Sequence, residues 1–455
     1  MANQTGTLYS YNVDQTGNTV PSAVGASADL RRIHNFGDRV AELAPDESPF
    51  FVYLNKVAKV PTNDPVFRFL ENRSKIDWTS RNFYIDGTAL TNVVADSNYT
   101  LTVDDNESSA SAIKYLVKGM VFAVETDRTA QSQVIFRVEG VTHNSNDTSV
   151  TARCIALSAS GSDATAYNDI ADGDECQIIG TSFAEGSGSP DVWSSQLDDD
   201  YGYTQIFKTA AEMTNTAIAT NYRGYANEWN RIWNLKLREH KVDIERAMLF
   251  GMRARSNSVQ YSEGLVGHIL QNGSAANFGS ASYSAGSPYF LSQASTDMIY
   301  DDLLGDFEVI FDPARGGNKS KLALASRPVL TFFNKMGSTG FVDQSVAADK
   351  MFQYDISSRD GSFGHQVMQV NTIHGDLSIV AEPLFRGIAS GYMALVDLDH
   401  VAYRPLVGNG LNRDTHIITN VQQADEDLRK DMIITEAGLE ITIPETHALY
   451  SFTDL

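Results

Sequence analysis

Cysteine, positive charge and long apolar runs are all scarce in this chain of 455 residues. Two cysteines, Cys154 and Cys176, exclude a disulfide framework and a cysteine-rich zinc site. Lys and Arg number 35 against 57 Asp and Glu, so the formal net charge of −22 disfavours a protein that grips nucleic acid. The first residues lack the basic and apolar regions of a signal peptide, and no apolar run approaches about 18 residues. We therefore expect no membrane span.

Sequence motifs for catalysis are missing as well. The nine histidines include no H-E-x-x-H pair, and neither a G-x-S-x-G elbow nor a Walker A phosphate loop occurs. The acidic clusters Asp198–Asp200 and Asp104–Glu107 do not follow the calcium-loop spacing, and we interpret them as solvated turns. Asp397, Asp399 and His400 form the most catalytic-looking group, after an expected strand. The pattern alone assigns no catalytic residue, cofactor or metal.

The first part of the chain predicts an arm, a helix and an extended excursion. Residues 1–30 hold no Lys or Arg and show no sustained period, which favours an extended arm. Apolar residues recur at helical spacing from Leu30 to Leu43, and Pro45 ends that helix. From Asn63 to about Asn98 the pattern predicts long strands with little core of their own. Residues 99–182 then carry short β-prone runs between turn clusters, which predicts a small barrel or sandwich.

The second part predicts a long helix followed by alternating helices and strands. Tyr225–Phe250 contains no Gly or Pro and has an apolar stripe at helical spacing, and Gly251 ends it. Residues 255–295 are rich in Ser, Gly, Asn and Ala and are expected to form a long loop, with a short hairpin as the alternative for part of it. Met432–Leu455 is expected to be a terminal hairpin with Gly438 near its turn. Between them, expected helices are Asp297–Phe311 and one beginning at Pro328, and expected strands are Lys321–Ala325, Val367–Val370, Leu377–Ala381 and Met393–Val396.

Four short segments carry a family resemblance in their order along the chain. They are Ala41–Phe50, Arg238–Gly251, Gly264-Leu265 with His268-Ile269, and Gly375–Val380 near Pro383. Together they resemble the entry segment, the end of the spine helix, the segment after it and the late A-domain strand of tailed-bacteriophage major capsid proteins with the HK97-type fold.

The resemblance implies an α+β, HK97-like capsid fold. Its parts are an N-terminal arm, a long E-loop carrying a small β-barrel or sandwich insertion, a P-domain with a long spine helix, and an α/β A-domain. The expected divisions are 1–61 for the arm and entry helix, 62–204 for the E-loop with its insertion at about 99–182, 205–295 for the P-domain spine helix and the loop after it, 296–405 for the A-domain, and 406–455 for strands that return to the P-domain.

Two sets of residues are expected to make contacts, one set between subunits and the other in the packing of the spine helix. Arginine and aromatic residues on an extended segment are typical of protein–protein contacts, although stacking on single-stranded nucleic acid is the weaker alternative. The expected subunit-interface residues are Arg68, Phe69, Arg73, Trp78, Arg81, Phe83 and Trp193. The expected packing residues of the spine helix are Tyr222, Tyr225, Trp229, Ile232, Trp233, Leu237, Ile244 and Met248.

The function that the resemblance implies is that of a major capsid protein without enzymatic activity. Copies would self-assemble into hexamers and pentamers of an icosahedral shell that encloses double-stranded DNA without binding it specifically. Portal, scaffold and decoration proteins are possible further partners, and no membrane partner is expected. The location would be the virion, with assembly in the host cytoplasm. Two alternatives stay open. One is a hydrolase-type enzyme that uses Asp397, Asp399 and His400 beside an accessory β module, and the other is a β-rich surface-binding protein.

Overall fold

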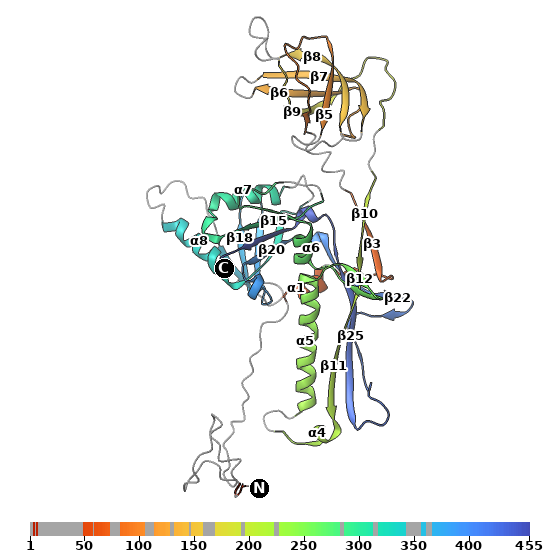
Figure 1. Ribbon diagram of the computed structural model, residues 1–455, viewed down its shortest axis with the longest axis vertical. Coiled ribbons are helices and arrows are strands. Elements are labelled where there is room, and N and C mark those ends of the chain that lie inside the picture. Colours follow the sequence, from red (N-terminus) through yellow and green to blue (C-terminus); the bar gives the residue numbers. More distant parts are fainter. Residues whose placement is uncertain are drawn as a thin grey trace. The chain divides into compact units, whose positions relative to one another are not determined.

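The computed structural model (Figure 1) describes most of the chain after the first segment. Its described residues are 3–4, 6–7, 49–57, 59–72, 82–104, 113–127, 132–144, 147–157, 169–192, 196–222, 227–282, 286–312, 317–342, 356–360 and 366–455. By their contacts, two compact units form: Met1–Asp46 with Ala210–Leu237 and Thr419–Asp431, and Glu47–Thr209 with Arg238–Ile418 and Met432–Leu455. The helix expected from Leu30 to Leu43 lies outside the described residues.

An eight-stranded mixed sheet is the largest sheet of the second unit. Its strand order is β14-β15-β26-β20-β16-β19-β18-β17. The bounds are β14 Ser274–Ala276, β15 Tyr289–Gln293, β26 Ala448–Phe452, β20 Tyr392–Val396, β16 Ser320–Ala325, β19 Asp376–Ala381, β18 Gln366–Asn371 and β17 Ile356–Asp360. At its centre β16 pairs parallel with β19 and antiparallel with β20. The strands expected from the apolar runs at β16, β18, β19 and β20 are confirmed.

Helices cover both faces of this sheet. Successive strand residues point to opposite faces, so β16 supplies Leu322 and Leu324 to one core and Ala323 and Ala325 to another. The first core also takes in α1 (Pro49–Val57), α5 (Glu228–Phe250) and α6 (Leu265–Asn272). The second takes in α7 (Tyr300–Ile310) and α8 (Arg327–Val342). The layers are therefore helix, sheet and helix (Figure 1).

A second sheet and several short elements complete the body. The sheet contains β11 (Gln205–Thr214), β25 (Leu428–Ile441) and β21 (Val401–Pro405) in that order, and β24 (His416–Ile418) also pairs with β25. The short elements are β1 Asn3–Gln4, β2 Gly6–Thr7, α4 Asn215–Ala219, β12 Ala254–Ser256, β13 Val259–Tyr261, β22 Val407–Gly408, β23 Leu411–Asn412, and the 3-10 turns η2 Ser295–Asp297, η4 Gly387–Ala389, η5 Leu398–His400 and η6 Pro444–Thr446.

The first unit has a small core of its own. Trp229, on the first turn of α5, is buried with Ala211 and Met213 of β11. Trp233, one turn later, stacks on Trp229 with ring centroids 6.3 Å apart. The guanidinium carbon of Arg429 lies 4.6 Å from the centroid of the Trp229 ring. Two tryptophans of α5 therefore take part in this core.

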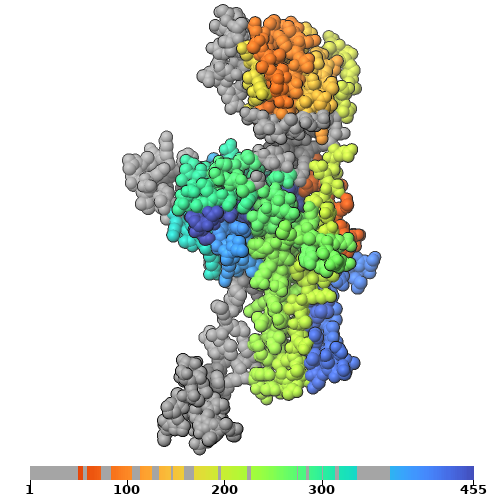
Figure 2. All heavy atoms as spheres, viewed as in Figure 1, coloured from red at the N-terminus to blue at the C-terminus, as the bar shows by residue number. Residues whose placement is uncertain are grey.

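The segment expected to form a barrel or sandwich forms a closed barrel. Its strands close in the order β4-β5-β8-β7-β6-β9. The bounds are β4 Asn82–Ile85, β5 Asn98–Asp104, β6 Met120–Asp127, β7 Ser132–His143, β8 Thr148–Leu157 and β9 Glu175–Thr181. Phe83, Phe122 and Phe136 fill the interior with no exposed surface, and Figure 2 shows the barrel as a continuous body of atoms. The barrel begins before residue 99, because β4 completes its closure.

The structure corrects three expectations for individual elements. The long helix begins at Glu228 rather than Tyr225, although it ends at Phe250 as expected. Helix α6 occupies part of the segment 255–295 that was expected to be a loop. The expectation of a terminal hairpin is wrong. Gly438 lies within β25, which pairs with β21, and β26 belongs to the large sheet instead. Among the described residues, no helix combines the length and apolar character needed to cross a bilayer.

Candidate functional site at the root of the β3–β10 ribbon

Two strands leave the body as a ribbon of their own. β3 (Val66–Glu71) pairs antiparallel with β10 (Asp198–Tyr203), and the register runs from Val66 opposite Tyr203 to Glu71 opposite Asp198. No third strand pairs with either among the described residues. The apolar side chains of Leu70 and Tyr201 remain 64% and 38% exposed. Because an isolated two-stranded ribbon is marginally stable in water, its ties to the body decide how firmly it is held.

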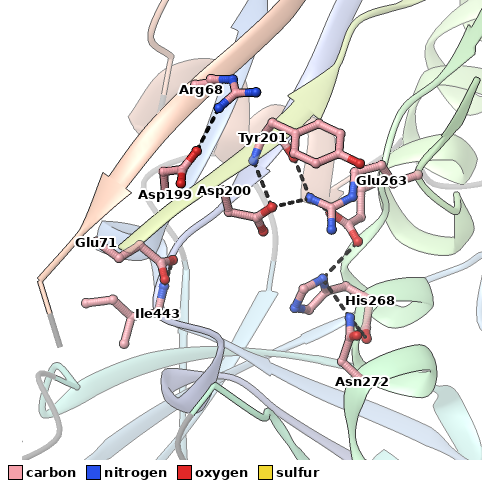
Figure 3. Close-up of polar contacts among 10 residues, drawn as sticks. Arg68, Glu71, Asp199, Asp200, Tyr201, Glu263, His268, Asn272 and Ile443 are labelled. Atoms are coloured by element: carbon pink, nitrogen blue, oxygen red, sulfur yellow. Dashed lines mark hydrogen bonds and ion pairs between the residues drawn. The ribbon is translucent and has the colours of Figure 1, made fainter. Parts of the chain in front are cut away.

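The strongest tie is made by Arg253, which follows α5. Its guanidinium donates to Asp200 at 2.6 Å, lies 3.8 Å from Glu263 and stacks over the ring of Tyr201 at 4.5 Å (Figure 3). Burial opposes the positive charge, but Glu263 and Asp200 outweigh it and raise the pKa of Arg253 above its ordinary value. One cation therefore joins the ribbon strand β10 to Glu263, two residues before α6.

The polar chain continues from Glu263 into helix α6. The other carboxylate oxygen of Glu263 lies 2.9 Å from Nδ1 of His268, and both side chains are 8% exposed. Asn272, one turn further, donates its amide to the carbonyl of His268 at 3.1 Å (Figure 3). Because Nδ1 of His268 faces the carboxylate of Glu263, Nδ1 is the ring nitrogen that carries a hydrogen and donates it. Asp200, Arg253, Glu263 and His268 therefore form a single network from the ribbon to α6.

A second tie fastens the ribbon at Glu71. This residue is 5% exposed, and its carboxylate accepts the backbone N–H of Ile443 at 2.7 Å (Figure 3). Ile443 has φ of +46°, a left-handed conformation that costs a β-branched residue free energy. The buried acceptor helps hold that conformation. The ribbon is thus held to the body at Asp200 of β10 and at Glu71, the last residue of β3.

These contacts are suited to holding the ribbon on the body. They show no arrangement of groups that could make or break a covalent bond. The network contains no hydroxyl or thiol nucleophile beside a base, and no group of three metal-ligating side chains gathers anywhere in the described residues. A hollow of about 530 Å³ near the root is lined by Pro61, Thr62, Asn63, Asp64, Val66, Phe67, Arg68, Arg404 and Val407. It contains none of the residues of the expected catalytic cluster.

That cluster has a structural role instead. Asp397 is fully buried and accepts the backbone N–H of Asp399 at 3.1 Å, which caps the turn η5. Its other oxygen accepts the backbone N–H of Asn318 at 2.8 Å and lies 3.8 Å from Nζ of Lys321. The buried Lys321 was missed by sequence reasoning, because an apolar strand with one lysine indicates an exposed amine. Here the amine donates to the carbonyl of Thr446 at 2.6 Å.

The expected interface residues separate into three groups. Arg68 and Phe69 lie on β3, where Arg68 is exposed and pairs with Asp199 of β10 at 2.8 Å (Figure 3). Phe83 does not fit its predicted role, because it is buried in the barrel core and offers no surface to a neighbour. The residues Arg73, Trp78, Arg81 and Trp193 lie outside the described residues.

The expected packing residues of the spine helix separate in a similar way. Trp229, Ile244 and Met248 are buried, and Ile232, Trp233 and Leu237 are half-buried. The expectation that Tyr222 packs as part of the spine helix is wrong, because Tyr222 precedes α5 and is 45% exposed. Tyr225 lies outside the described residues. The residues that sequence reasoning missed at the ribbon root, above all Arg253, Glu263 and Glu71, have partners remote in the chain, and no local pattern marks them.

The described residues thus combine a layered α/β body, a long helix, a two-stranded ribbon and a closed barrel. The sequence model of the SU10 major capsid protein family matches residues 5–454. The chain therefore belongs to the SU10 major capsid protein family and is a major capsid protein, as the sequence led us to expect. The family is a structural one, which points away from enzymatic activity.

Solved structures give further matches of low identity. A capsid chain of the native GTA particle is 10% identical, with a TM-score of 0.42, over 95% of this chain and 99% of that one. A chain of Microbacterium phage Oxtober96 is 8% identical, with a TM-score of 0.45, over 92% and 96% of the two chains. A chain of Mycobacterium phage Patience is 18% identical, with a TM-score of 0.37, over 61% and 78%. The search of curated proteins returned no match.

Proposed function

We propose that copies of this chain assemble into the hexamers and pentamers of an icosahedral shell that encloses double-stranded DNA. Self-assembly into capsomers and a place in the virion follow from the family. The finer proposal covers the ring sizes, the enclosed DNA, assembly in the host cytoplasm and the absence of any enzymatic step. Portal, scaffold and decoration proteins are the further partners we propose, on the strength of the family alone.

The observation that carries the proposal is the exposed β3–β10 ribbon. Neither strand pairs with a third strand among the described residues, and Leu70 keeps 64% of its surface exposed. A neighbouring subunit that covered the ribbon would bury this apolar surface. A contact in which one subunit's ribbon lies on a different surface of the next is heterologous, and heterologous contacts close into rings.

The net charge supports enclosure without specific binding. The chain carries a formal charge of −22, so a shell of many copies repels a polyanion wherever its inner face carries a share of that charge. Packaged DNA would then meet a wall to which it does not adhere. This part of the proposal predicts that purified chain does not retain DNA at physiological salt, in contrast to proteins whose affinity comes from Lys and Arg contacts to phosphate.

The experiment is expression of the full chain followed by electron microscopy of the products. Wild type and Leu70→Met are expected to form closed shells, whereas Leu70→Asp is expected to give free subunits or capsomers. Because Leu70 is exposed in the subunit, Leu70→Asp changes subunit stability by only about 0.5 kcal/mol or less, which circular dichroism verifies. Shells formed equally well by Leu70→Asp would contradict the role of the ribbon.

A further inference from the structure

Two carboxyl groups are buried together between the spine helix and the large sheet. Glu245 lies on α5 and is fully buried, and Glu382, which directly follows β19, is 1% exposed. One oxygen of each is held by the backbone. The N–H of Phe50 donates to Oε1 of Glu245 at 2.7 Å, and the N–H of Leu384 donates to Oε1 of Glu382 at 3.1 Å. Among the described residues, no N–H or hydroxyl group of a third residue reaches the Oε2 atom of either carboxyl group.

The two groups form a hydrogen bond with each other through their side chains. Such a bond requires a proton between them, because two ionised carboxylates repel at close range. Burial, and then the charge of Glu382, raise the pKa of Glu245 to about 10. Burial also raises the pKa of Glu382, to about 7, although the Leu384 amide and the bond from Glu245 oppose this. The pair therefore holds one proton between its two carboxyl groups over this range.

The pair is the point where three segments of the chain meet. The backbone amides of Phe50 and Phe51, in the first turn of α1, both bond to Glu245. Helix α1 would otherwise leave these first-turn amides without an acceptor. Phe50 and Leu54 of α1 pack in the same core as Met248 of α5. The pair therefore connects the start of α1 to α5 and to the end of β19.

No cation offsets the charge of the pair. The described elements packed around this core carry other titratable groups, and none of them bonds to either carboxyl group. These groups are Tyr53 of α1, His268 of α6, Lys321 of β16, Tyr392 of β20, Tyr403 of β21, and Glu436 and Glu440 of β25. His268 is engaged by Glu263, and Lys321 by Thr446. Loss of the shared proton would therefore leave two uncompensated negative charges in the core.

We propose that Glu245 and Glu382 share one proton and act as a pH-dependent latch on the start of α1. With the proton present, the pair holds α1 against α5 and the end of β19. Its loss in alkaline solution drives the carboxylates apart and releases the start of α1 from α5 and from the end of β19. The release of α1 occurs only in alkaline solution. In acid the pair takes up a second proton, which removes its negative charge and creates no repulsion.

The test is pulsed hydrogen exchange of the full chain at about pH 6 and about pH 10. Glu245→Gln is the informative variant, because the amide keeps an oxygen for Phe50 and an N–H donor for Glu382, with no proton to lose. Asp243→Asn is the matched control, since Asp243 is an exposed residue of the same helix. Comparison of variants at one pH cancels the intrinsic pH dependence of exchange.

We expect amides of residues 49–57 to exchange about tenfold faster in wild type and Asp243→Asn than in Glu245→Gln at about pH 10, with no difference at about pH 6. Equal exchange in wild type and Glu245→Gln at the alkaline pH would overturn the proposal. Should Glu245→Gln not fold, Glu382→Gln provides the same comparison. The wild type by itself also tests the proposal. If amides of residues 49–57 lose no more protection at the alkaline pH than amides of β20, the change is general unfolding and the latch is overturned.

Discussion

Removal of the Arg253 side-chain charge should loosen the root of the ribbon. In Arg253→Met the guanidinium no longer bonds to Asp200 or stacks on Tyr201, and Glu263 keeps a carboxylate that is only 8% exposed. A hydrogen bond to a charged group contributes about 1.5–3 kcal/mol, and a cation over an aromatic face about 0.5–1 kcal/mol. Arg253 and Asp200 are 23% and 35% exposed. After a discount for solvent screening, the expected loss is about 2 kcal/mol.

Native-state hydrogen exchange is the appropriate assay, because a chain of two contact units need not unfold in one step. A loss of about 2 kcal/mol corresponds to about 30-fold faster exchange of amides in β3 and β10. Arg68→Met is the matched control on the same ribbon, since the Arg68–Asp199 pair is 70% and 55% exposed and should change exchange little. Equal effects of the two variants would refute the assignment of Arg253 as the main tie.

Two further predictions concern buried positions. Gly438→Ala places a Cβ 2.5 Å from the Tyr203 carbonyl oxygen and 2.8 Å from the Phe67 ring, and should cost about 1–3 kcal/mol in thermal unfolding, whereas Gly305→Ala, in open space, should cost nothing. Equal melting temperatures would contradict the close packing. Burial lowers the pKa of Lys321 from 10.5 to about 8, so between these values the unfolded chain binds more protons, and Lys321 contributes a rise in stability with pH of about 3 kcal/mol. Urea unfolding of Lys321→Met should lack this rise, and an unchanged rise would refute it.

Local signals in the sequence predicted the elements that local physics determines. The apolar stripe of α5 and its end before Gly251 were readable, because a helix face repeats and glycine ends it. The strand β16 was readable as a short apolar run that is buried on both faces. The order of segments was also enough to indicate the capsid family, to which the chain belongs.

Glycine was misread where it serves long-range packing. Gly438 indicates a turn by composition, but β25 runs straight through it, and a side chain there would collide with Tyr203. Gly267 lies inside α6, where a Cβ would stand 2.1 Å from the carbonyl oxygen of Gly251. Helix α6 was therefore hidden in a segment rich in small residues, since its glycine is required by contact with the end of α5.

The polar ties could not be predicted, because their partners are far apart in the chain. Arg253 meets Asp200 across 53 positions, and Glu71 meets Ile443 across 372. The acids Asp198–Asp200, interpreted from sequence as a solvated turn, are a strand of the ribbon, and Asp200 is part of its attachment. Only the pairing of β3 with β10 makes that role visible.

We propose that this capsid protein builds its shell through the exposed ribbon, and cryo-electron microscopy of purified assemblies is the decisive test. We expect closed icosahedral shells of hexamers and pentamers in which β3 and β10 of each subunit lie against a neighbouring copy, with Leu70 buried in that contact. Shells in which the ribbon is solvated on both faces, or a chain that remains a monomer under assembly conditions, would contradict it.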